Sequence, residues 1–502
     1  MSFFYNHESY KKPSLALLTD LYQLTMSYGY WKTGMDKKES VFHLFFRKPP
    51  FHGGFTIASG LESAVKYLEN FRFEKSDLDY LATLRGSENT PFFCSDFLKY
   101  LENLHFTCDI DAVPEGTVVF PYEPLLRIQG PLIQCQLLES PLLNLINFPS
   151  LIATKAARMC IASKGDPIIE FGLRRAQGMD GALTASRAAY IGGCTSTSNV
   201  LAGKLFGIPV QGTHSHSWVM AFDEEIEAFQ SYAENVPGNY VFLVDTYDSI
   251  EGIKKAIEVG KWLKANEKKF LGVRLDSGDL AHLSIKCREL LDEAGFNDTM
   301  IVASNELDEV IISELKRQGA QIAVWGVGTN LVTAKDYPAL DGVYKISALR
   351  DPGGPWKYKI KLTEQMVKIS NPGILQVRRY YTDKGNIADA IYDLNNNQLN
   401  ENCCIVDPLD PTQQHTMKKS MQSKDLLVPI FRGGRLVYKL PKLDEIREKT
   451  QNELKHFHVG IKRFLNPHKY VVGLEKTLYD LKIDLIKSIR TKSSQAYLPF
   501  EE

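Results

Sequence analysis

Two imidazoles and a pair of guanidinium groups follow short apolar runs in the middle of the chain. His214 and His216 follow one run, and Arg174 and Arg175 follow another. A neutral imidazole is a nucleophile or general base near pH 7, and arginine forks grip phosphate or carboxylate oxygens in pairs. The arginines would otherwise be a salt-bridged surface pair, and no third His or adjacent Cys completes a zinc set with the two imidazoles. We therefore expect an anionic ligand here.

Carboxylates follow a further run, in the segment GVRLDSGDL. Shortly after Arg274 come Asp276, Ser277, Gly278 and Asp279, where a helix is expected to begin. A carboxylate pair at a free helix amino terminus suits ribose hydroxyls or a hydrated Mg²⁺, which takes few protein carboxylates and completes its shell with substrate oxygens. One of the two aspartates is also expected to cap the helix.

Glycine-rich turns with hydroxyl side chains end three further runs. Glycine lets a ligand approach the backbone, and hydroxyls can bond phosphate oxygens. The last turn comes late in the series, at the usual position of a phosphate cradle in barrel folds, although its GxGT pattern alone is a weak signal. Together with the arginines and carboxylates, the turns predict an enzyme that acts on a phosphorylated sugar. They occupy residues 192–199, 212–217 and 325–330.

The elements that position these residues alternate between short apolar runs and helix-like segments, from about residue 150 to 347. Continuous apolar strands that alternate with helices predict an α/β fold with a parallel sheet, and this many in succession favours an incomplete TIM-like barrel over an open sheet. In either fold, ligands bind at the carboxyl ends of the strands. The runs are IIEFGLRR, AAYIGGC, IPVQGTHSH, VFLVDTYD, FLGVRLDSGD, MIVASNE, IAVWGVGT and GVYKIS.

Both flanks of the chain are β-rich with a few helices. The first flank has β-like runs at 41–48, 116–120 and 125–130 around the helical stretch LESAVKYLENF. The second has two long β-like segments, with a hairpin turn at 383–386, and ends in two helices. We therefore expect a mixed α+β domain built from 1–145 with 355–502, and a barrel domain at 146–354.

Composition limits the partners of the chain. Its 502 residues carry 59 Lys+Arg against 60 Asp+Glu, a net charge of -1, which supplies no overall field for nucleic acid or an anionic membrane. The first residues lack the apolar core of a signal peptide, and polar residues interrupt the most apolar stretch. The 8 Cys show no metal-binding spacing. We expect a cytoplasmic protein with reduced, mostly buried thiols.

Longer motifs run through most of the chain. They are TDLYQLTM (19–26), VPEGTVVFPYEPLLRIQGP (113–131), FGLRRAQGMDGALTASRAAYIGGCTSTSN (171–199), GTHSHSW (212–218), GVRLDSGDL (272–280), VWGVGTNLVT (324–333), GVYKI (342–346), LVPIFRGGRLVY and VGLEKTLYDLK. These motifs resemble the nicotinate phosphoribosyltransferases, a family of type II phosphoribosyltransferases. The resemblance implies an incomplete α/β barrel plus a mixed domain from the flanks, and a homodimer with shared active sites. It implies transfer from 5-phosphoribosyl 1-pyrophosphate to nicotinate, with Mg²⁺ and with coupled ATP hydrolysis.

The resemblance also implies roles for single residues. Phe171 and a neighbouring subunit's Tyr22 would sandwich the pyridine ring. Arg174 and Arg274 would bind nicotinate and phosphoribosyl pyrophosphate between them, and which arginine meets which anion stays open. His216 aligns with the family's phosphorylated histidine. Catalysis would then rest on His216, Arg274 and Asp276, Mg²⁺ on Asp276 and Asp279, and the phosphates on Arg174, Arg175, Thr213, Ser277, Gly278, Ser304, Asn305, Gly326, Gly328 and Thr329.

Other functions stay open on the residues alone. A nicotinamide-specific enzyme would need an acceptor such as Asp for the amide, and the run 195–198 offers hydroxyls and no Asp, which weakly favours the acid. A silent, ligand-sensing barrel would be expected to have lost one of His216, Asp276, Arg174 or Arg274, and all four are present. A quinolinate-using relative would usually be shorter and more basic at its site.

Overall fold

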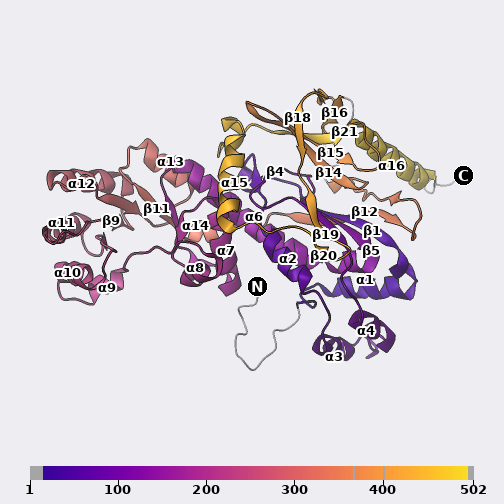
Figure 1. Cartoon of the computed structure of the whole chain (residues 1–502), viewed down its shortest axis with the longest axis horizontal. Helices are drawn as coiled ribbons and strands as arrows, with labels where there is room; N and C mark the ends of the chain where they lie inside the picture. The colour runs from indigo at the N-terminus through magenta and orange to yellow at the C-terminus, as the bar shows by residue number, and fades with distance from the viewer. Residues whose placement is uncertain (1–14, 366–367, 400–401, 496–502) are drawn as a thin grey trace, which may run out of the picture. The chain divides into compact units, whose positions relative to one another are not determined.

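A parallel sheet carries the polar strand ends, with strand order β7-β6-β11-β10-β9-β8. Figure 1 labels two of its strands, β9 and β11. The sheet belongs to a computed structural model that describes residues 15–365, 368–399 and 402–495. The strands are short and almost entirely buried, as expected for a sheet covered by helices. The predicted parallel α/β arrangement is confirmed. The strands are β6 (Ile168–Glu170), β7 (Ser196–Thr197), β8 (Val241–Leu243), β9 (Gly272–Leu275), β10 (Met300–Ala303) and β11 (Val324–Val327).

Helices follow these strands, and three of them begin at an aspartate cap. The side chains of Asp248, Asp279 and Asp308 each accept hydrogen bonds from backbone N–H groups of the following helix. Such caps fix the point where each strand-end loop turns into a helix. The elements are η3 (Leu173–Arg175), α7 (Gly178–Gly192), α8 (Val200–Phe206), α9 (His216–Met220), α10 (Glu225–Asn235), α11 (Ser249–Ala265), α12 (Leu280–Glu293), α13 (Glu309–Arg317) and α14 (Thr329–Val332).

Three of the predicted barrel strands are wrong. AAYIGGC lies largely in α7, because short apolar runs in buried helices and in buried strands look alike and this stretch is rich in alanine. IPVQGTHSH forms only an isolated bridge, Thr197 to Val210. GVYKIS lies in β12 (Gly342–Arg350), which pairs antiparallel with β1 (Glu39–Phe46) in a different sheet.

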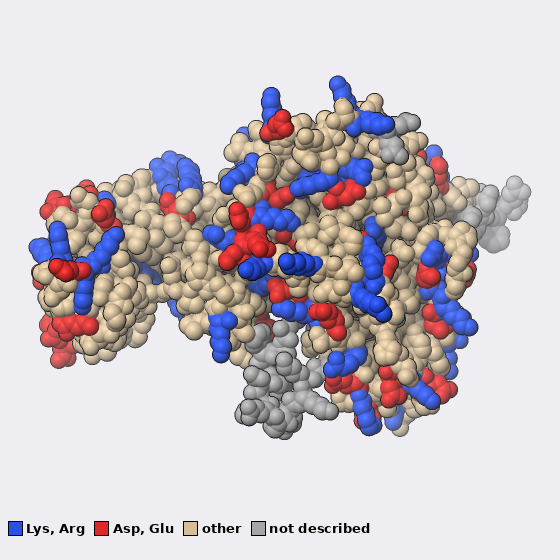
Figure 2. All heavy atoms as spheres, viewed as in Figure 1, with Lys and Arg blue, Asp and Glu red and all other residues tan. Residues whose placement is uncertain are grey.

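The chain divides into two compact units. The unit with the parallel sheet comprises Leu151–Pro338 and Leu443–Gln451, and the mixed unit comprises Met1–Ser150, Ala339–Lys442 and Asn452–Glu502. Lys and Arg side chains lie among Asp and Glu side chains on the face drawn in Figure 2.

The mixed unit is built around two sheets, with strand orders β13-β12-β1-β5-β3-β19-β20 and β17-β16-β21-β15-β14-β18. The predicted hairpin at 383–386 joins β14 to β15. The further strands are β2 (Thr56–Ile57), β3 (Asp109–Ala112), β4 (Val118–Val119), β5 (Leu126–Pro131), β13 (Lys357–Tyr358), β14 (Leu375–Thr382), β15 (Gly385–Asp393), β16 (Cys403–Val406), β17 (Gln414–Met417), β18 (Gln422–Asp425), β19 (Val428–Arg432), β20 (Arg435–Leu436) and β21 (Val471–Glu475).

Helices complete the chain, and the predicted last two form. None of the helices found in the described residues combines the length and the apolar character needed to cross a membrane. They are α1 (Leu21–Lys32), α2 (Leu61–Glu69), α3 (Lys75–Thr83), α4 (Ser95–Glu102), α5 (Leu132–Leu137), α6 (Glu139–Ala162), α15 (Leu443–Lys455) and α16 (Lys476–Gln495), with η1 (Met35–Lys37), η2 (Pro50–His52) and η5 (Val459–Lys462).

Candidate active site

Arg274, in β9, is fixed by three side chains from different segments. Its Nε donates to Ser304 Oγ at 2.7 Å, its Nη1 to Thr213 Oγ1 at 3.0 Å and its Nη2 to Asp276 Oδ1 at 3.1 Å. The guanidinium carbon lies 5.4 Å from the centroid of the Phe171 ring. A guanidinium has five N–H donors, so this network sets its plane and leaves donors for a ligand. The structure therefore brings together five of the predicted site residues.

His216 begins α9 beside the same carboxylate. Its Nδ1 lies 3.1 Å from Thr246 Oγ1, and its Nε2 lies 3.7 Å from Asp276 Oδ2. The side chain is 40% exposed, which leaves the ring open to a ligand. A hydroxyl on one nitrogen and a carboxylate near the other orient the imidazole, as a nucleophilic or proton-carrying histidine requires.

His214, two residues earlier, has a structural environment instead. Its Nε2 accepts the Leu243 N–H at 3.2 Å, which leaves the proton on Nδ1, where Ser215 O lies at 3.3 Å. The ring packs against Tyr232 and Phe242. Burial lowers the pKa of His214 from its ordinary 6.5 to about 4. The two imidazoles of the HxH motif therefore have different environments.

The depressed pKa of His214 predicts an acid-labile contribution to stability. The neutral ring stabilises the fold fully above pH 6.5, and this contribution is lost as the pH falls toward 4, because the unfolded state binds the proton first. The loss by pH 4 is about 3 kcal/mol at most. Thermal unfolding followed from pH 7 to pH 4 should show this loss in the wild-type protein and a smaller one in His214→Gln. Equal pH dependence of both would contradict it.

Asp245, directly after β8 and Val244, is a site residue that the sequence analysis missed. Its Oδ2 accepts the Asp276 N–H at 2.9 Å and the Ser277 hydroxyl at 2.6 Å. Its Oδ1 is buried and has no hydrogen-bond partner among the described residues. A buried carboxylate oxygen without a partner is costly and is typical of a cation site or of strained catalytic machinery. The sequence did contain the signal used for the other site residues: the apolar run VFLVD ends in a carboxylate, just as the neighbouring runs end in polar residues.

Phe171 is held at the end of β6 by close backbone packing. Its N–H donates to Val327 O at 2.7 Å, and a Cβ placed on Gly326 would lie 2.6 Å from the ring carbon Cε2. Position 326 therefore needs glycine to leave room for the ring. The glycine-rich strand end that predicted a phosphate cradle also shapes the seat of this aromatic side chain.

Glu170 is a second residue that the sequence analysis missed. Its carboxylate is 1% exposed and accepts hydrogen bonds from Ser186 Oγ at 2.8 Å, from Thr197 Oγ1 at 2.6 Å and from the Gly172 N–H. It thus ties α7, β7 and the turn after Phe171 together. A lone acidic residue inside an apolar run gave no functional signal in the sequence, because the segments that it joins are far apart along the chain.

The remaining predicted residues lie in four kinds of environment. Arg174 and Arg175 are exposed in η3, and neither guanidinium bonds another described residue. Asp279 caps α12 through Oδ1, which confirms the expected cap. Tyr22 lies on α1 in the mixed unit and is 48% exposed. Gly278 and Asn305 have positive φ, and Gly328 and Thr329 lie between β11 and the start of α14.

Profiles of one family match most of the chain. The N-terminal domain of nicotinate phosphoribosyltransferase matches residues 17–147, the nicotinate phosphoribosyltransferase family profile matches 167–351, and the C-terminal domain matches 375–482. The second match contains every strand of the parallel sheet and all of the strand-end residues described above.

Individual relatives extend this similarity over nearly the full length. A nicotinate phosphoribosyltransferase from Bacillus subtilis is 42% identical over 96% of this chain and 97% of its own. One from Caenorhabditis elegans is 38% identical over 92% of each chain. The crystal structure of human nicotinic acid phosphoribosyltransferase superposes with a TM-score of 0.78 at 31% identity, covering 93% of this chain and 99% of the human one.

Proposed function

The chain belongs to the nicotinate phosphoribosyltransferase family, and we propose that the strand-end residues of its parallel sheet join nicotinate to 5-phosphoribosyl 1-pyrophosphate. The enzyme forms nicotinate mononucleotide and pyrophosphate, the first step of NAD salvage from nicotinate. The observation that carries the assignment of the site is the network of Arg274 with Thr213, Asp276 and Ser304 beside the Phe171 ring.

Bond breakage at ribose C1 builds positive charge on the sugar and negative charge on the leaving pyrophosphate. Fixed cations aimed at the leaving group are therefore worth more in the transition state than in the ground state. The proposal assigns the leaving pyrophosphate to three cations at the carboxyl ends of the strands: the exposed Arg174 and Arg175, and Arg274, which its hydrogen bonds hold in place. The carboxylate of Asp276 is assigned to the positively charged sugar, near the developing oxocarbenium ion or the ribose hydroxyls.

The nicotinate ring is assigned to Phe171. A ring nitrogen attacks ribose C1 only when the pyridine is held in line, which requires stacking and a grip on the carboxylate. Arg274 lies over Phe171, so a cation and an aromatic face are already paired there. This pairing favours the acid over nicotinamide. The hydroxyls of Thr195, Ser196 and Thr197 are bonded within the protein and do not make this distinction.

The carboxylates at the carboxyl ends of the parallel strands fit a Mg²⁺ ion. The unpartnered, buried Oδ1 of Asp245 and the Oδ2 of Asp276 are oxygen donors of the kind that Mg²⁺ takes, and Asp279 has one oxygen committed to its helix cap. We propose that Asp245 and Asp276 hold the ion, directly or through water, with Asp279 nearby. Bound there, Mg²⁺ would neutralise charge on the pyrophosphate.

ATP coupling is assigned to His216. An imidazole nitrogen attacks the γ-phosphorus of ATP, the bond to the β-γ bridging oxygen breaks, and ADP leaves, so the ring carries the phosphoryl group until water removes it. Asp276 and Thr246 hold the ring on either side. The proposal rests on the exposed ring of His216 and on the buried, structurally committed ring of His214.

Gly326→Ala tests the nicotinate seat. The added methyl group would meet the Phe171 ring at 2.6 Å, so the ring must move away from its position under Arg274. We expect the KM for nicotinate to rise about tenfold or more, with a smaller change in the KM for phosphoribosyl pyrophosphate. Product formation from both substrates, followed by mass spectrometry, measures both constants. Gly181→Ala is the matched control, because nothing lies within 4 Å of its added Cβ; equal kinetics of both variants would remove Phe171 from the ring site.

A homodimer with shared sites is proposed from α1. Leu18, Leu21, Tyr22 and Met26 leave an exposed apolar strip that begins just before this helix and continues along it, and Tyr22 is 48% exposed. An aromatic side chain in such a strip can pack against the surface of a second subunit, and it can also stack on a ligand bound there.

Mixing two inactive variants tests the shared site. Tyr22→Ala removes the ring donated to the other subunit, and Arg274→Lys damages the subunit's own site. In a mixed dimer, one of the two sites has both residues intact. We expect about a quarter of wild-type activity to return after co-refolding of equal amounts, from the statistics of random pairing. No recovery, with dimers present by light scattering, would contradict the proposal.

Three further assignments stay predictions. The parallel sheet is proposed to curve into an incomplete barrel. The functional domains are proposed as 1–145 with 355–502 and as 146–354. The protein is proposed to be cytoplasmic.

A further inference from the structure

Glu170, the last residue of β6, is a buried carboxylate that no cation neutralises. The side chain is 1% exposed, and its hydrogen bonds within the described part of the chain all come from neutral groups. The donors are the Gly172 N–H and the hydroxyls of Ser186 and Thr197. Taking a carboxylate out of water is costly unless such donors replace the water. A charge held in this way, directly before Phe171, therefore requires an explanation.

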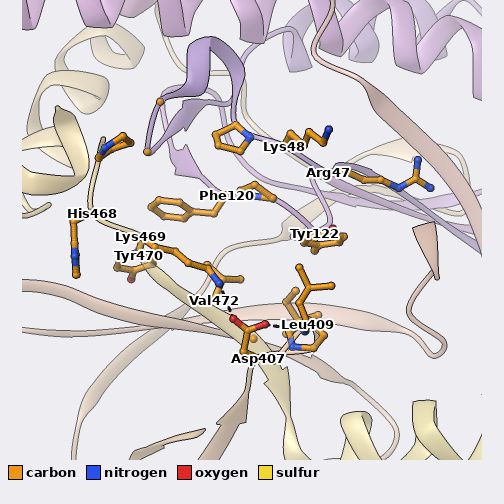
Figure 3. A pocket seen from close by; sticks show the side chains of 18 residues that line it. Arg47, Lys48, Phe120, Tyr122, Asp407, Leu409, His468, Lys469, Tyr470 and Val472 are labelled. Atoms are coloured by element: carbon orange, nitrogen blue, oxygen red, sulfur yellow. Dashed lines mark hydrogen bonds and ion pairs between the residues drawn. The ribbon is translucent and has the colours of Figure 1, made fainter. Parts of the chain in front are cut away.

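Two largely buried carboxylates in the mixed unit have cationic partners instead. Asp407 accepts a hydrogen bond from Lys469 Nζ at 2.6 Å, which Figure 3 shows as a dashed line. Asp389 accepts one from Nε of the buried Arg379 at 2.9 Å. In these pairs the carboxylate and the cation satisfy each other. Glu170 differs because hydroxyl and amide donors occupy its oxygens, so the carboxylate engages no cation.

The Gly172 N–H connects this carboxylate to the turn that carries the two arginines. The Gly172 carbonyl accepts the Arg175 N–H at 2.8 Å, at η3, which contains Arg174 and Arg175. A Cβ at position 172 would lie 2.2 Å from Val332 Cγ1 and 3.0 Å from Glu170 Oε1, so this close approach requires glycine. The carboxylate thus fixes the backbone of the turn and leaves both guanidinium groups without an acceptor among the described residues.

Asn199 orients both hydroxyls toward the carboxylate. Its Oδ1 accepts the Ala202 N–H at 3.2 Å, which directs its Nδ2 to Ser186 Oγ at 3.2 Å. Its N–H donates to Thr197 Oγ1 at 3.0 Å. Both hydroxyls accept from Asn199 and donate to Glu170 Oε2, at 2.8 and 2.6 Å. Because a hydroxyl has a single proton to donate, this arrangement suits an acceptor at that position and not an amide N–H.

We propose that Glu170 is a positioning residue for the phosphoribosyl transfer, and that its carboxylate holds the turn 171–175 so that Phe171, Arg174 and Arg175 are preorganised for the anionic substrates. The inference rests on the function proposed for those three residues. Substrates can restore the order of a loosened turn only by giving up binding energy. Loss of the carboxylate should therefore weaken substrate binding more than it slows the bound complex.

Glu170→Gln tests the inference, because it keeps the shape of the side chain and removes its charge. The glutamine must turn its oxygen to the Gly172 N–H, which places its NH₂ group against the hydroxyls of Ser186 and Thr197. We expect the KM values for nicotinate and for phosphoribosyl pyrophosphate each to rise about tenfold, with kcat within about threefold of wild type. A purely structural role would reduce the amount of active enzyme, and so kcat, without changing KM.

Glu115→Gln is the matched control in the mixed unit. Glu115 is 5% exposed and also accepts hydrogen bonds from a glycine N–H and a serine hydroxyl, those of Gly60 at 2.6 Å and Ser59 at 3.4 Å. The substitution therefore repeats the loss of a buried charge away from the turn. It should leave both KM values unchanged. Equal KM values in the Glu115 and Glu170 variants would overturn the inference.

Thr197→Val is a milder variant that removes one of the three donors and keeps the carboxylate. It provides the same test if Glu170→Gln is too unstable to purify. We expect both KM values to rise about threefold, since the Gly172 N–H and the Ser186 hydroxyl still hold Glu170. Wild-type KM values in this variant and in Glu170→Gln would overturn the inference.

Amide hydrogen exchange on the substrate-free protein separates this inference from the proposed function. In Glu170→Gln, exchange in the segment 171–177 should accelerate about tenfold, and exchange in 272–280 should match wild type. An unchanged rate in 171–177, or faster exchange there with unchanged KM values, would overturn the inference and leave the proposed function intact. Absence of nicotinate turnover in the wild-type protein would instead reject the proposed function, and the exchange rates would still report whether Glu170 holds the turn.

Discussion

Replacing His216 with alanine should abolish ATP hydrolysis while a slower, ATP-independent transfer persists. The side chain is the exposed imidazole between Thr246 and Asp276, and no other imidazole among the described residues bonds either of them. We expect the rate of ADP formation to fall more than about a hundredfold, because the nucleophile itself is lost. Transfer without ATP should fall about tenfold or less, since Arg274 and Phe171 remain in place. Parallel assays of ADP and nicotinate mononucleotide measure both rates, and intact-mass analysis after ATP treatment reads the phosphoryl group directly.

Two controls sharpen this test. His415→Ala removes an exposed imidazole in the mixed unit and should leave both rates unchanged. In His216→Ala, the Asp276–Arg274 contact should survive, so binding of phosphoribosyl pyrophosphate should change little. Retention of coupled hydrolysis in His216→Ala would reject the phosphohistidine.

Arg274→Lys should damage transfer almost as severely, although it keeps the positive charge. The guanidinium bonds Ser304, Thr213 and Asp276 with three different nitrogens, and one ammonium cannot reach all three in that planar arrangement. The aspartate and the Phe171 face would lose their common partner. We expect kcat/KM for nicotinate to fall about 10² to 10³-fold, as when one fixed transition-state donor is removed.

Arg288→Lys is a matched control in the same unit. The guanidinium of Arg288 also donates hydrogen bonds from all three nitrogens, to Asp292, Thr299 O and Phe296 O, but these bonds connect α12 to the loop that follows it. The Arg288→Lys substitution should lower the unfolding midpoint and leave kcat/KM near the wild-type value. If Arg274→Lys instead lowers stability and spares kcat/KM, Arg274 is a structural residue and leaves the site.

The sequence predicted the parallel sheet because its signal is local. Each of the β8, β9, β10 and β11 strands is a short apolar run that ends in a polar residue. The failures have a physical cause as well. AAYIGGC is apolar all round because α7 is buried, and GVYKIS is a strand whose partner, β1, lies some three hundred residues earlier. Burial and long-range pairing are properties of the fold that no short window contains.

The site was predictable to a similar degree. The structure brings Arg274, Asp276 and His216 together, and the sequence placed them in one predicted site because charged residues at strand ends are visible in one dimension. Asp245 had the same signal and was passed over, whereas Glu170 had none, since its contacts with Ser186 and Thr197 exist only after folding. The different environments of His214 and His216 also required the structure, because packing against Tyr232 and Phe242 distinguishes two imidazoles that the HxH motif makes equivalent.

The most direct test of the central claim is a paired assay on the purified protein with phosphoribosyl pyrophosphate and Mg²⁺. Nicotinate or nicotinamide is offered, each with and without ATP, and the mononucleotide and ADP are followed together. We predict turnover of nicotinate that ATP raises, with ADP released. Turnover of nicotinamide alone, or of neither base, would contradict the assignment of Arg274 and Phe171 to a carboxylate-bearing ring.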